Sequence, residues 1–216
     1  MAEIYLLRHA HSIANERGML AGRTAGVNLS KIGELQRDQI ALSLKDMEFV
    51  AIYSSPMERC IETVAPLAKQ AKRRIRILEE FNEMDYGDWS GAKLSGLRLK
   101  PLWRKIQRRP KEVTFPGGES FISAQRRIRR GLSNIEKRHK KGKVLLVSHG
   151  DIIKIAIQET LSGDLDKFQR IVIDPASLSV IDWNRRLLIS SNTSLARPVK
   201  ERGLKSRTTL GGGSNV

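Results

Sequence analysis

The sequence has few of the residues that build covalent or metal cross-links. Cys60 is the only cysteine, and there are four histidines in 216 residues. A single cysteine excludes a disulfide within the chain and a zinc site made of several thiolates. No apolar run approaches the roughly 18 residues of a membrane-spanning helix, and the opening MAEIYLL has no basic segment of the kind that begins a signal peptide. We therefore expect a cytoplasmic protein with no membrane partner.

Negative charge is also scarce. The chain has 39 Lys and Arg against 23 Asp and Glu, a formal net charge of +16. Such a field attracts anions, whether phosphorylated metabolites, nucleic acid or anionic lipid. A solvated helix face explains any single basic run equally well. The excess lies in residues 69–76, 98–111, 126–143 and the last thirty of the chain.

The length and the 40% hydrophobic residues suit one domain with a proper core. We expect this domain to span residues 1–197. Residues 198–216 are basic and rich in Gly and Ser, without periodicity, and we expect them to form a flexible tail. The sequence does not indicate an oligomeric state.

Apolar strand-like runs alternate with amphipathic stretches along the domain. This alternation predicts an α/β fold, a three-layer sandwich with a mostly parallel central sheet and helices on both faces. The predicted strands are 3–8, 49–54, 74–78 and 144–149, with 177–183 and 187–191 as edge strands, and the predicted helices are 28–44, one that starts at 55–58, a short one around 97–108, 120–140 and 150–161.

Local patterns predict how three of these helices begin and which residues face the core. Ser30 is the expected N-cap of 28–44, with an inner stripe at Ile32, Leu35 and Leu42. Ser55, Pro56 and Glu58 form a capping-box pattern with proline at the first helical position. Two further sets are expected to face inward: Ile61, Val64, Ala68 and Ala71, and in 120–140 Phe121, Ala124, Ile128, Leu132 and Ile135.

Arginine and histidine follow three of the predicted strands. Arg8 and His9 end the first strand, Arg59 lies shortly after the second, and His149 ends the fourth. Ligands in such sheets bind beyond the carboxyl ends of the strands. Guanidinium groups match phosphate oxygens, and a neutral imidazole can attack phosphorus. The set therefore predicts a site for a dianion. The remaining histidine, His139, is expected at the solvated surface.

Two other chemistries fit less well. His9 and His11 share a strand face and could both ligate zinc. A catalytic zinc site usually needs a third protein ligand, however, and the chain has none of the usual zinc-binding motifs that would supply one. Arg8 would also repel the ion. A cysteine phosphatase needs an arginine six positions after Cys60, where Pro66 stands. Cys60 is better read as a small core residue.

The motif LLRHAHSIAN resembles the RHG signature of the histidine phosphatase (phosphoglycerate mutase-like) superfamily. Four more segments resemble motifs of that family, in its order and over about residues 3–185: SSPMERCIET, FNEMDYGDWSG, FPGGES and LLVSHGDIIK. The resemblance implies a phosphoglycerate mutase-like fold and an enzyme of phosphoryl transfer that needs no cofactor and no metal. It also implies that residues 84–118 cover the substrate.

The resemblance implies a role for each matching residue. His9 is the nucleophile that forms a phosphohistidine, and Glu83 protonates the leaving oxygen and then activates water. A carboxyl that works as an acid near neutral pH needs a raised pKa, so Glu83 should be partly buried or lie near the negative charge of the phosphate. The implied catalytic set is His9, Glu83, His149, Arg8 and Arg59, and the implied substrate-binding set is Arg8, Asn15, Gly22, Arg23, Arg59 and His149.

Some features leave alternatives open. Ala10 stands where the signature usually has glycine, and His11 follows at a variable position where it could tune a pKa, touch substrate or pack. Asn15 could instead be a helix cap, and Trp89 and Trp103 could line a cleft, although packing suits them better.

The expected activity is hydrolysis of a small phosphorylated metabolite. A phosphomutase would share every motif and differ only in returning the phosphate to substrate. The basic helix 126–143 and the tail admit a nucleic-acid-binding protein, but stacking aromatics and a recognisable module are missing, so a nucleic-acid partner is unlikely.

Overall fold

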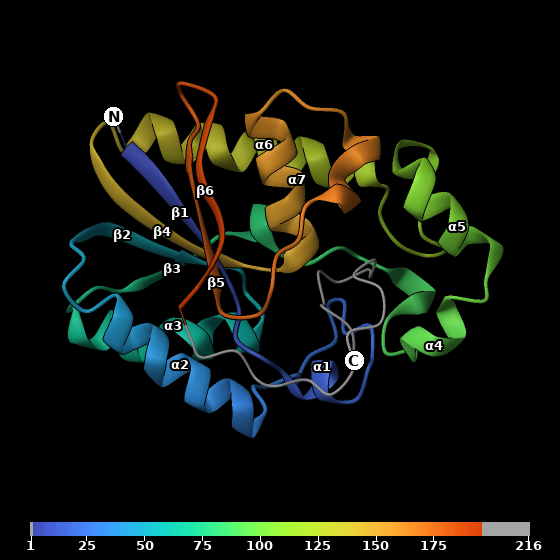
Figure 1. Cartoon of the computed structure of the whole chain (residues 1–216), viewed down its shortest axis with the longest axis horizontal. Helices are drawn as coiled ribbons and strands as arrows, with labels where there is room; N and C mark the ends of the chain where they lie inside the picture. The colour runs from blue at the N-terminus through green and yellow to red at the C-terminus, as the bar shows by residue number, and fades with distance from the viewer. Residues whose placement is uncertain (1, 196–216) are drawn as a thin grey trace.

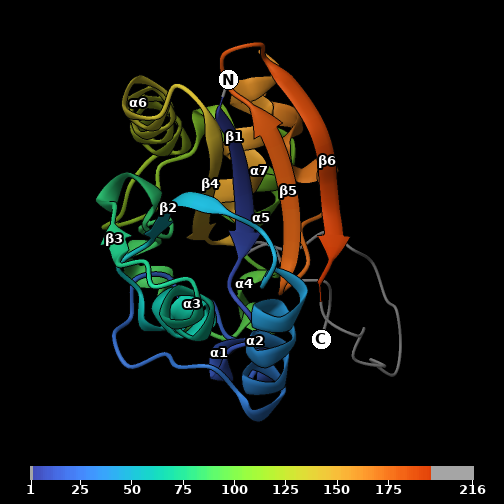
Figure 2. The same ribbon diagram turned by 90° about the vertical axis from the view of Figure 1, so that its left-hand side faces the viewer.

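The chain forms one central sheet of six strands in the order β3-β2-β4-β1-β5-β6, which Figure 2 shows from its left side to its right. The structure, a computed structural model, describes residues 2–195. The pairs β3–β2, β2–β4 and β4–β1 are parallel, while β5 pairs antiparallel with β1 and with β6. The strands are β1 (Ala2–Arg8), β2 (Phe49–Ser54), β3 (Ile75–Ile77), β4 (Gly142–Ser148), β5 (Ser177–Asp182) and β6 (Leu187–Ser194).

Helices cover both faces of the sheet, as predicted (Figure 1). The helices α2 (Lys31–Ser43) and α3 (Glu58–Gln70) lie on one face, and α6 (Phe121–Arg138) and α7 (Gly150–Thr160) lie on the other. Residues of β1 alternate between the two cores: Ile4 and Leu6 pack on the α6 side, and Leu7 packs on the α2 side. The inner strands β1, β2, β4 and β5 are buried along most of their length because helices cover both faces, whereas the edge strands β3 and β6 are largely exposed.

Shorter elements connect these layers. They are α1 (Ile13–Glu16), α4 (Leu94–Leu97), α5 (Pro101–Arg108) and the 3₁₀ turns η1 (Glu79–Phe81), η2 (Gly87–Trp89), η3 (Pro110–Glu112) and η4 (Leu165–Arg170). The predicted short helix around 97–108 is α5, which begins at Pro101 rather than at residue 97, and α4 precedes it. Within residues 2–195, every helix is too short or too polar to cross a membrane. The expected tail, 198–216, lies outside the described residues.

Most predicted elements are confirmed, but one predicted inner stripe is wrong. Ser30 caps α2, and its hydroxyl accepts a hydrogen bond from Gly33 N. Leu35 and Leu42, however, are 67% and 64% exposed. The helix turns Gly33, Gln36, Ile40 and Ala41 inward instead, because its close approach to the loop at His11 leaves no room for a larger side chain at position 33. The α6 stripe is buried as expected, whereas Ala71 after α3 is exposed.

Three further expectations need correction. The predicted capping box at Ser55 does not form: α3 starts at Glu58 after Met57, which makes no side-chain cap, and the Ser55 hydroxyl instead lies 2.7 Å from Nε2 of His149. His139 is half-buried rather than solvated, since its Nε2 lies 2.8 Å from the Tyr53 hydroxyl. Strand β5 is not an edge strand, because β6 covers its outer side.

Residues 84–118 pack onto the body of the molecule through aromatic residues. Trp89 and Trp103 are buried in the larger core, which confirms packing as their role. The segment also touches the loop before α2, where Leu20 N donates to Ala92 O and Gly91 N donates to Leu20 O.

Candidate active site

The end of β1 delivers Arg8 and His9 to the carboxyl edge of the sheet. Backbone bonds hold this end firmly: His9 N donates to Ser148 O at 3.0 Å, and Ala10 N donates to the Thr63 hydroxyl at 2.9 Å. Both Arg8 and His9 are buried, and Nη1 of Arg8 donates to Ile173 O at 2.7 Å. The chain therefore presents a guanidinium and an imidazole at a rigid strand end.

The hydrogen bond of the His9 ring determines its tautomer. Nδ1 lies 2.8 Å from the carbonyl oxygen of Ala10, which can only accept, so Nδ1 carries the proton. Nε2 is left with its lone pair. Burial, and then the charges of Arg59 and Arg8, hold the pKa of His9 well below its ordinary value of 6.5. The ring is therefore neutral and its Nε2 is available as a nucleophile.

Arg59, near the start of α3, lies under the loop that contains Gly22. Its Nη2 donates to Gly22 O at 2.9 Å and lies 3.2 Å from Nδ1 of His149. Nη1 is buried and has no hydrogen-bond partner within residues 2–195. A buried guanidinium donor without a hydrogen-bond partner is energetically costly, so Nη1 is well suited to donate a hydrogen bond to a bound anion. Gly22 has φ +55°, and a Cβ there would lie 2.7 Å from the Ser90 hydroxyl.

His149 follows β4 and lies edge-on to His9, with 5.3 Å between the ring centroids. Because a guanidinium only donates, the contact with Arg59 makes Nδ1 of His149 an acceptor. The ring proton then sits on Nε2, facing Ser55. Burial, and then the charges of Arg59 and His9, hold the pKa of His149 well below 6.5. The ring is thus neutral here, rather than the imidazolium that a phosphate site would favour.

Glu83 is buried beside His149. Its Oε2 lies 3.5 Å from Nδ1 of His149, and its Oε1 accepts from Met84 N at 3.0 Å. Burial, and then the charge of Asp151, raise the pKa of Glu83 to about 7, against the opposing effect of Arg59. A carboxyl with this pKa holds its proton for part of the time near neutral pH, which is what a general acid and base requires.

A hydrogen-bond network fixes the segment that carries Glu83. The Ser148 hydroxyl donates to Phe81 O at 2.8 Å, which ties the segment to the end of β4. Arg127 of α6 donates to Glu80 O, Asn82 O and Glu83 O. The carboxyl is therefore positioned by both the sheet and α6.

Of the two remaining predicted site residues, Arg23 contacts the backbone of Glu83, whereas Asn15 takes part in the capping of α1. Nε of Arg23 donates to Glu83 O at 2.9 Å, and its other nitrogens pair with Glu119 and Asp85. The side-chain oxygen of Asn15 accepts from Ser12 in the capping box of α1, the alternative role for this residue. Asn15 is half-buried and Arg23 is about one-third exposed.

His11 is half-buried, and its ring contacts a different partner from that of His9. Its Nδ1 lies 2.8 Å from the Ser30 hydroxyl, and its backbone N donates to the side chain of Gln36. Burial, and then Arg8, lower its pKa. Residues 2–195 contain no group of three His, Cys, Asp or Glu placed to hold a metal ion.

The sequence analysis missed residues that support the site. Asp151 is fully buried, accepts from the Tyr86 hydroxyl at 2.9 Å and lies 3.4 Å from Nζ of Lys154. The sequence signal that could have found Asp151 is its position two residues after His149 in the motif LLVSHGD. Ser55 was assigned to a cap because its local pattern matches one; only the fold brings His149 to it.

Two buried arginines, two neutral imidazoles and a carboxyl with a pKa near neutrality together form a candidate site for phosphoryl transfer. A family model described as "Histidine phosphatase superfamily (branch 1)" matches residues 4–189. The chain belongs to this superfamily and is a phosphoryl-transfer enzyme.

Known proteins agree with this assignment. Phosphoserine phosphatase 1 of Hydrogenobacter thermophilus is 32% identical over 188 residues, which cover 86% of this chain and 89% of that protein. Among solved structures, a mycobacterial glucosyl-3-phosphoglycerate phosphatase gives a TM-score of 0.80 at 22% identity, covering 89% of this chain and 99% of its own. The alpha-ribazole phosphatase of Shigella flexneri gives 0.79 at 23%, covering 92% and 100%. The two structures confirm the fold.

Proposed function

We propose that the chain hydrolyses a small phosphorylated metabolite in the cytoplasm through a phosphohistidine on His9, without a metal. The observation that carries this proposal is the tautomer of His9, whose Nδ1 is occupied by Ala10 O while Nε2 is left with its lone pair beside Arg59 and His149.

In the first step Nε2 of His9 attacks phosphorus, so that a P–N bond forms as the ester P–O bond breaks. Arg8, Arg59 and His149 surround the phosphoryl oxygens and stabilise the charge that spreads over them. The unpaired Nη1 of Arg59 supports its part in this role. Protonated Glu83 gives its proton to the leaving oxygen, which departs as an alcohol.

In the second step water attacks the phosphohistidine. The Glu83 carboxylate takes a proton from the water as the P–N bond breaks, and His9 is restored together with inorganic phosphate. Bound phosphate adds negative charge beside His149 and opposes the effect of Arg59 on its pKa. His149 is then able to take up a proton when the substrate is present.

The substrate-binding assignments extend this proposal to the rim of the site. Gly22 holds Arg59 through its carbonyl, and Arg23 stands over the backbone of Glu83, where it can meet the substrate. Asn15 contributes its amide nitrogen, and residues 84–118 cover the substrate, as their contacts with the loop at Leu20 allow. The related protein from Hydrogenobacter is named a phosphatase, which favours a hydrolase over a mutase.

The test is turnover of p-nitrophenyl phosphate in EDTA by the wild type and by His9→Ala. We expect the variant to lose roughly 10³-fold or more of the activity while its circular dichroism spectrum stays native, because the nucleophile is gone. His139→Ala, which removes a histidine that follows α6 and contacts the Tyr53 hydroxyl, is the matched control and keeps its activity.

Two results would overturn the proposal: full activity in His9→Ala, or wild-type activity that requires added zinc. A screen of phosphorylated metabolites that measures both inorganic phosphate and product isomers separates hydrolase from mutase and identifies the substrate class.

A further inference from the structure

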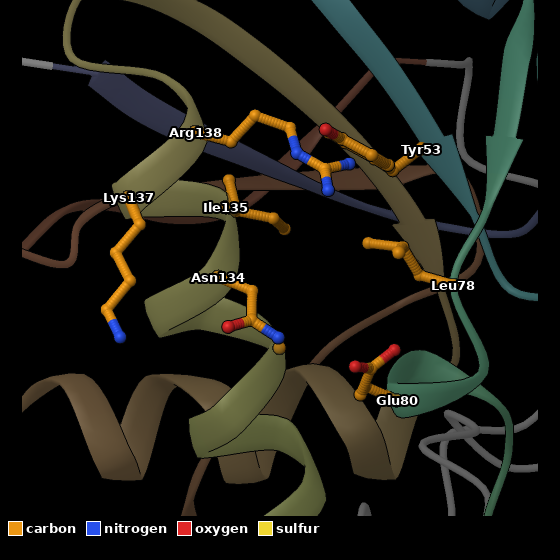
Figure 3. Close-up of a pocket in the computed structure, with 8 residues that line it drawn as sticks. Tyr53, Leu78, Glu80, Asn134, Ile135, Lys137 and Arg138 are labelled. Atoms are coloured by element: carbon orange, nitrogen blue, oxygen red, sulfur yellow. The ribbon is translucent and has the colours of Figure 1, made fainter.

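A cavity whose lining includes neither His9 nor His149 lies near the edge of the sheet, between β2, the segment before Glu83 and the C-terminal half of α6. Its volume is about 530 Å³. Tyr53, Leu78 and Glu80 form one side, and Asn134, Ile135 and Arg138 form the other (Figure 3). None of these residues belongs to the catalytic set.

The helix face explains the shape of the cavity. Gly131 lets η1 pack directly on α6, since a Cβ at this position would lie 2.6 Å from Cε2 of Phe81. One to two turns further on, Asn134, Ile135 and Arg138 stand on the same face of α6 as Gly131 and form a wall. The result is a hollow beside a tightly packed contact.

The charges around the cavity are mostly positive. Lys137 and Arg138 form no ion pair within residues 2–195, and the neighbouring Glu136 pairs with Lys140 instead. The Arg76 guanidinium stands 5.8 Å from the centre of the Tyr53 ring. Unpaired cations beside a cavity favour a ligand with negative charge, and a guanidinium matches phosphate and carboxylate oxygens.

One carboxylate, Glu80, lines the same cavity. Figure 3 shows Arg138 near Tyr53 at one end and Glu80 at the other. Glu80 also forms no side-chain ion pair in the described chain. Arg138 and Glu80 line the same cavity but do not pair with each other. They can therefore bind the two ends of one ligand that carries an anionic group at one end and a donor at the other.

We propose that this cavity binds a small organic anion, a phosphate, phosphonate or carboxylate, that also carries an amino or hydroxyl donor. The anionic group contacts Arg138, with Lys137 and Arg76 adding positive charge. The donor contacts Glu80, and the Asn134 amide bonds to either part.

Such a ligand acts on the segment that carries Glu83. Glu80 lies three residues before Glu83, and the backbone between them is held by Arg127 and Ser148. Binding at Glu80 therefore changes the surroundings of the Glu83 backbone. An effect on turnover rests on the proposed function, whereas binding itself does not.

The test is an amide-resolved NMR titration of the full chain with 2-aminoethylphosphonate, whose P–C bond the proposed reaction does not cleave. We expect saturable shifts at Leu78, Glu80 and Asn134, followed by a smaller shift at Met84. Arg138→Ala should weaken binding about tenfold or more, because a charged hydrogen bond is lost. Arg126→Ala makes the same change of charge on the same helix, more than three turns before Arg138, and should keep the affinity within twofold.

A second variant separates the two ends of the ligand. Glu80→Gln should weaken binding of 2-aminoethylphosphonate but leave binding of inorganic phosphate at this cavity unchanged. The titration repeated in His9→Ala should still give the cavity shifts, so failure of the proposed function is distinguishable from failure of this site. Equal affinity in Arg138→Ala and wild type, or shifts confined to the neighbourhood of His149, would overturn the proposal. Dispersed spectra of each variant verify that it is folded.

Discussion

Replacing Glu83 by glutamine is expected to change how the stability of the chain depends on pH. In the folded chain burial and Asp151 raise the pKa of Glu83 from 4.5 to about 7. At a pH between 4.5 and about 7, the folded chain therefore keeps the Glu83 proton, whereas the unfolded chain has released it. Stability falls with rising pH wherever the folded state binds more protons, so the wild type loses stability across this window.

The size of the loss follows from the difference in pKa. A difference of one in pKa corresponds to about 1.4 kcal/mol, so ionising buried Glu83 costs about 3 kcal/mol of folding free energy by pH 8. Glu83→Gln has no proton to lose. Its free energy of unfolding, relative to the wild type, should rise by about 3 kcal/mol between pH 4 and pH 8.

Urea unfolding of both proteins at several pH values measures this difference. The other titrating groups are present in both chains, so comparing the two isolates the change at Glu83. Glu48→Gln, an exposed carboxyl, is the matched control and should follow the wild type. A difference that stays flat from pH 4 to pH 8 would refute the reasoning, because Glu83 would then titrate alike in the folded and unfolded chain.

Two further predictions concern the surroundings of the site. Gly33→Ala should lower the free energy of unfolding by about 3 kcal/mol, because the new Cβ would lie 1.9 Å from the backbone oxygen of His11. Gly96 has open space around it, so Gly96→Ala is the control and should change the free energy of unfolding by less than about 0.5 kcal/mol. Urea unfolding measures both. Asp151→Asn removes a negative charge that raises the pKa of Glu83. The alkaline limb of the kcat/KM profile for p-nitrophenyl phosphate should therefore move to lower pH. An unmoved limb would show that Glu83 is not the group that titrates.

The α/β architecture and most element positions were predictable because they depend on local patterns. A buried strand such as 49–54 is a short apolar run, and Ser30 caps its helix through a bond to a residue three positions away. The errors arise where a distant segment competes. Ser55 has the pattern of a cap, yet it faces His149, which lies 94 residues further along the chain.

The same competition explains the wrong helix face of α2. Leu35 and Leu42 have helical spacing, but the close approach of Gly33 to the backbone of His11 rotates the helix so that Gln36 and Ile40 face inward. Side-chain hydrophobicity alone does not show which backbone comes nearest. His139 is a comparable case, since its partner Tyr53 belongs to another strand and is 86 residues away.

For the candidate site, too, the local sequence determines some properties and the tertiary structure determines others. The sequence by itself determined which groups gather at the strand ends, because Arg8, His9 and His149 follow apolar runs whose carboxyl ends meet at one edge of a parallel sheet. Only the tertiary structure decided their chemical states. The tautomer of His9, the neutral form of His149 and the raised pKa of Glu83 depend on burial and on charges from other segments, and neither burial nor those distances exist until the chain has folded.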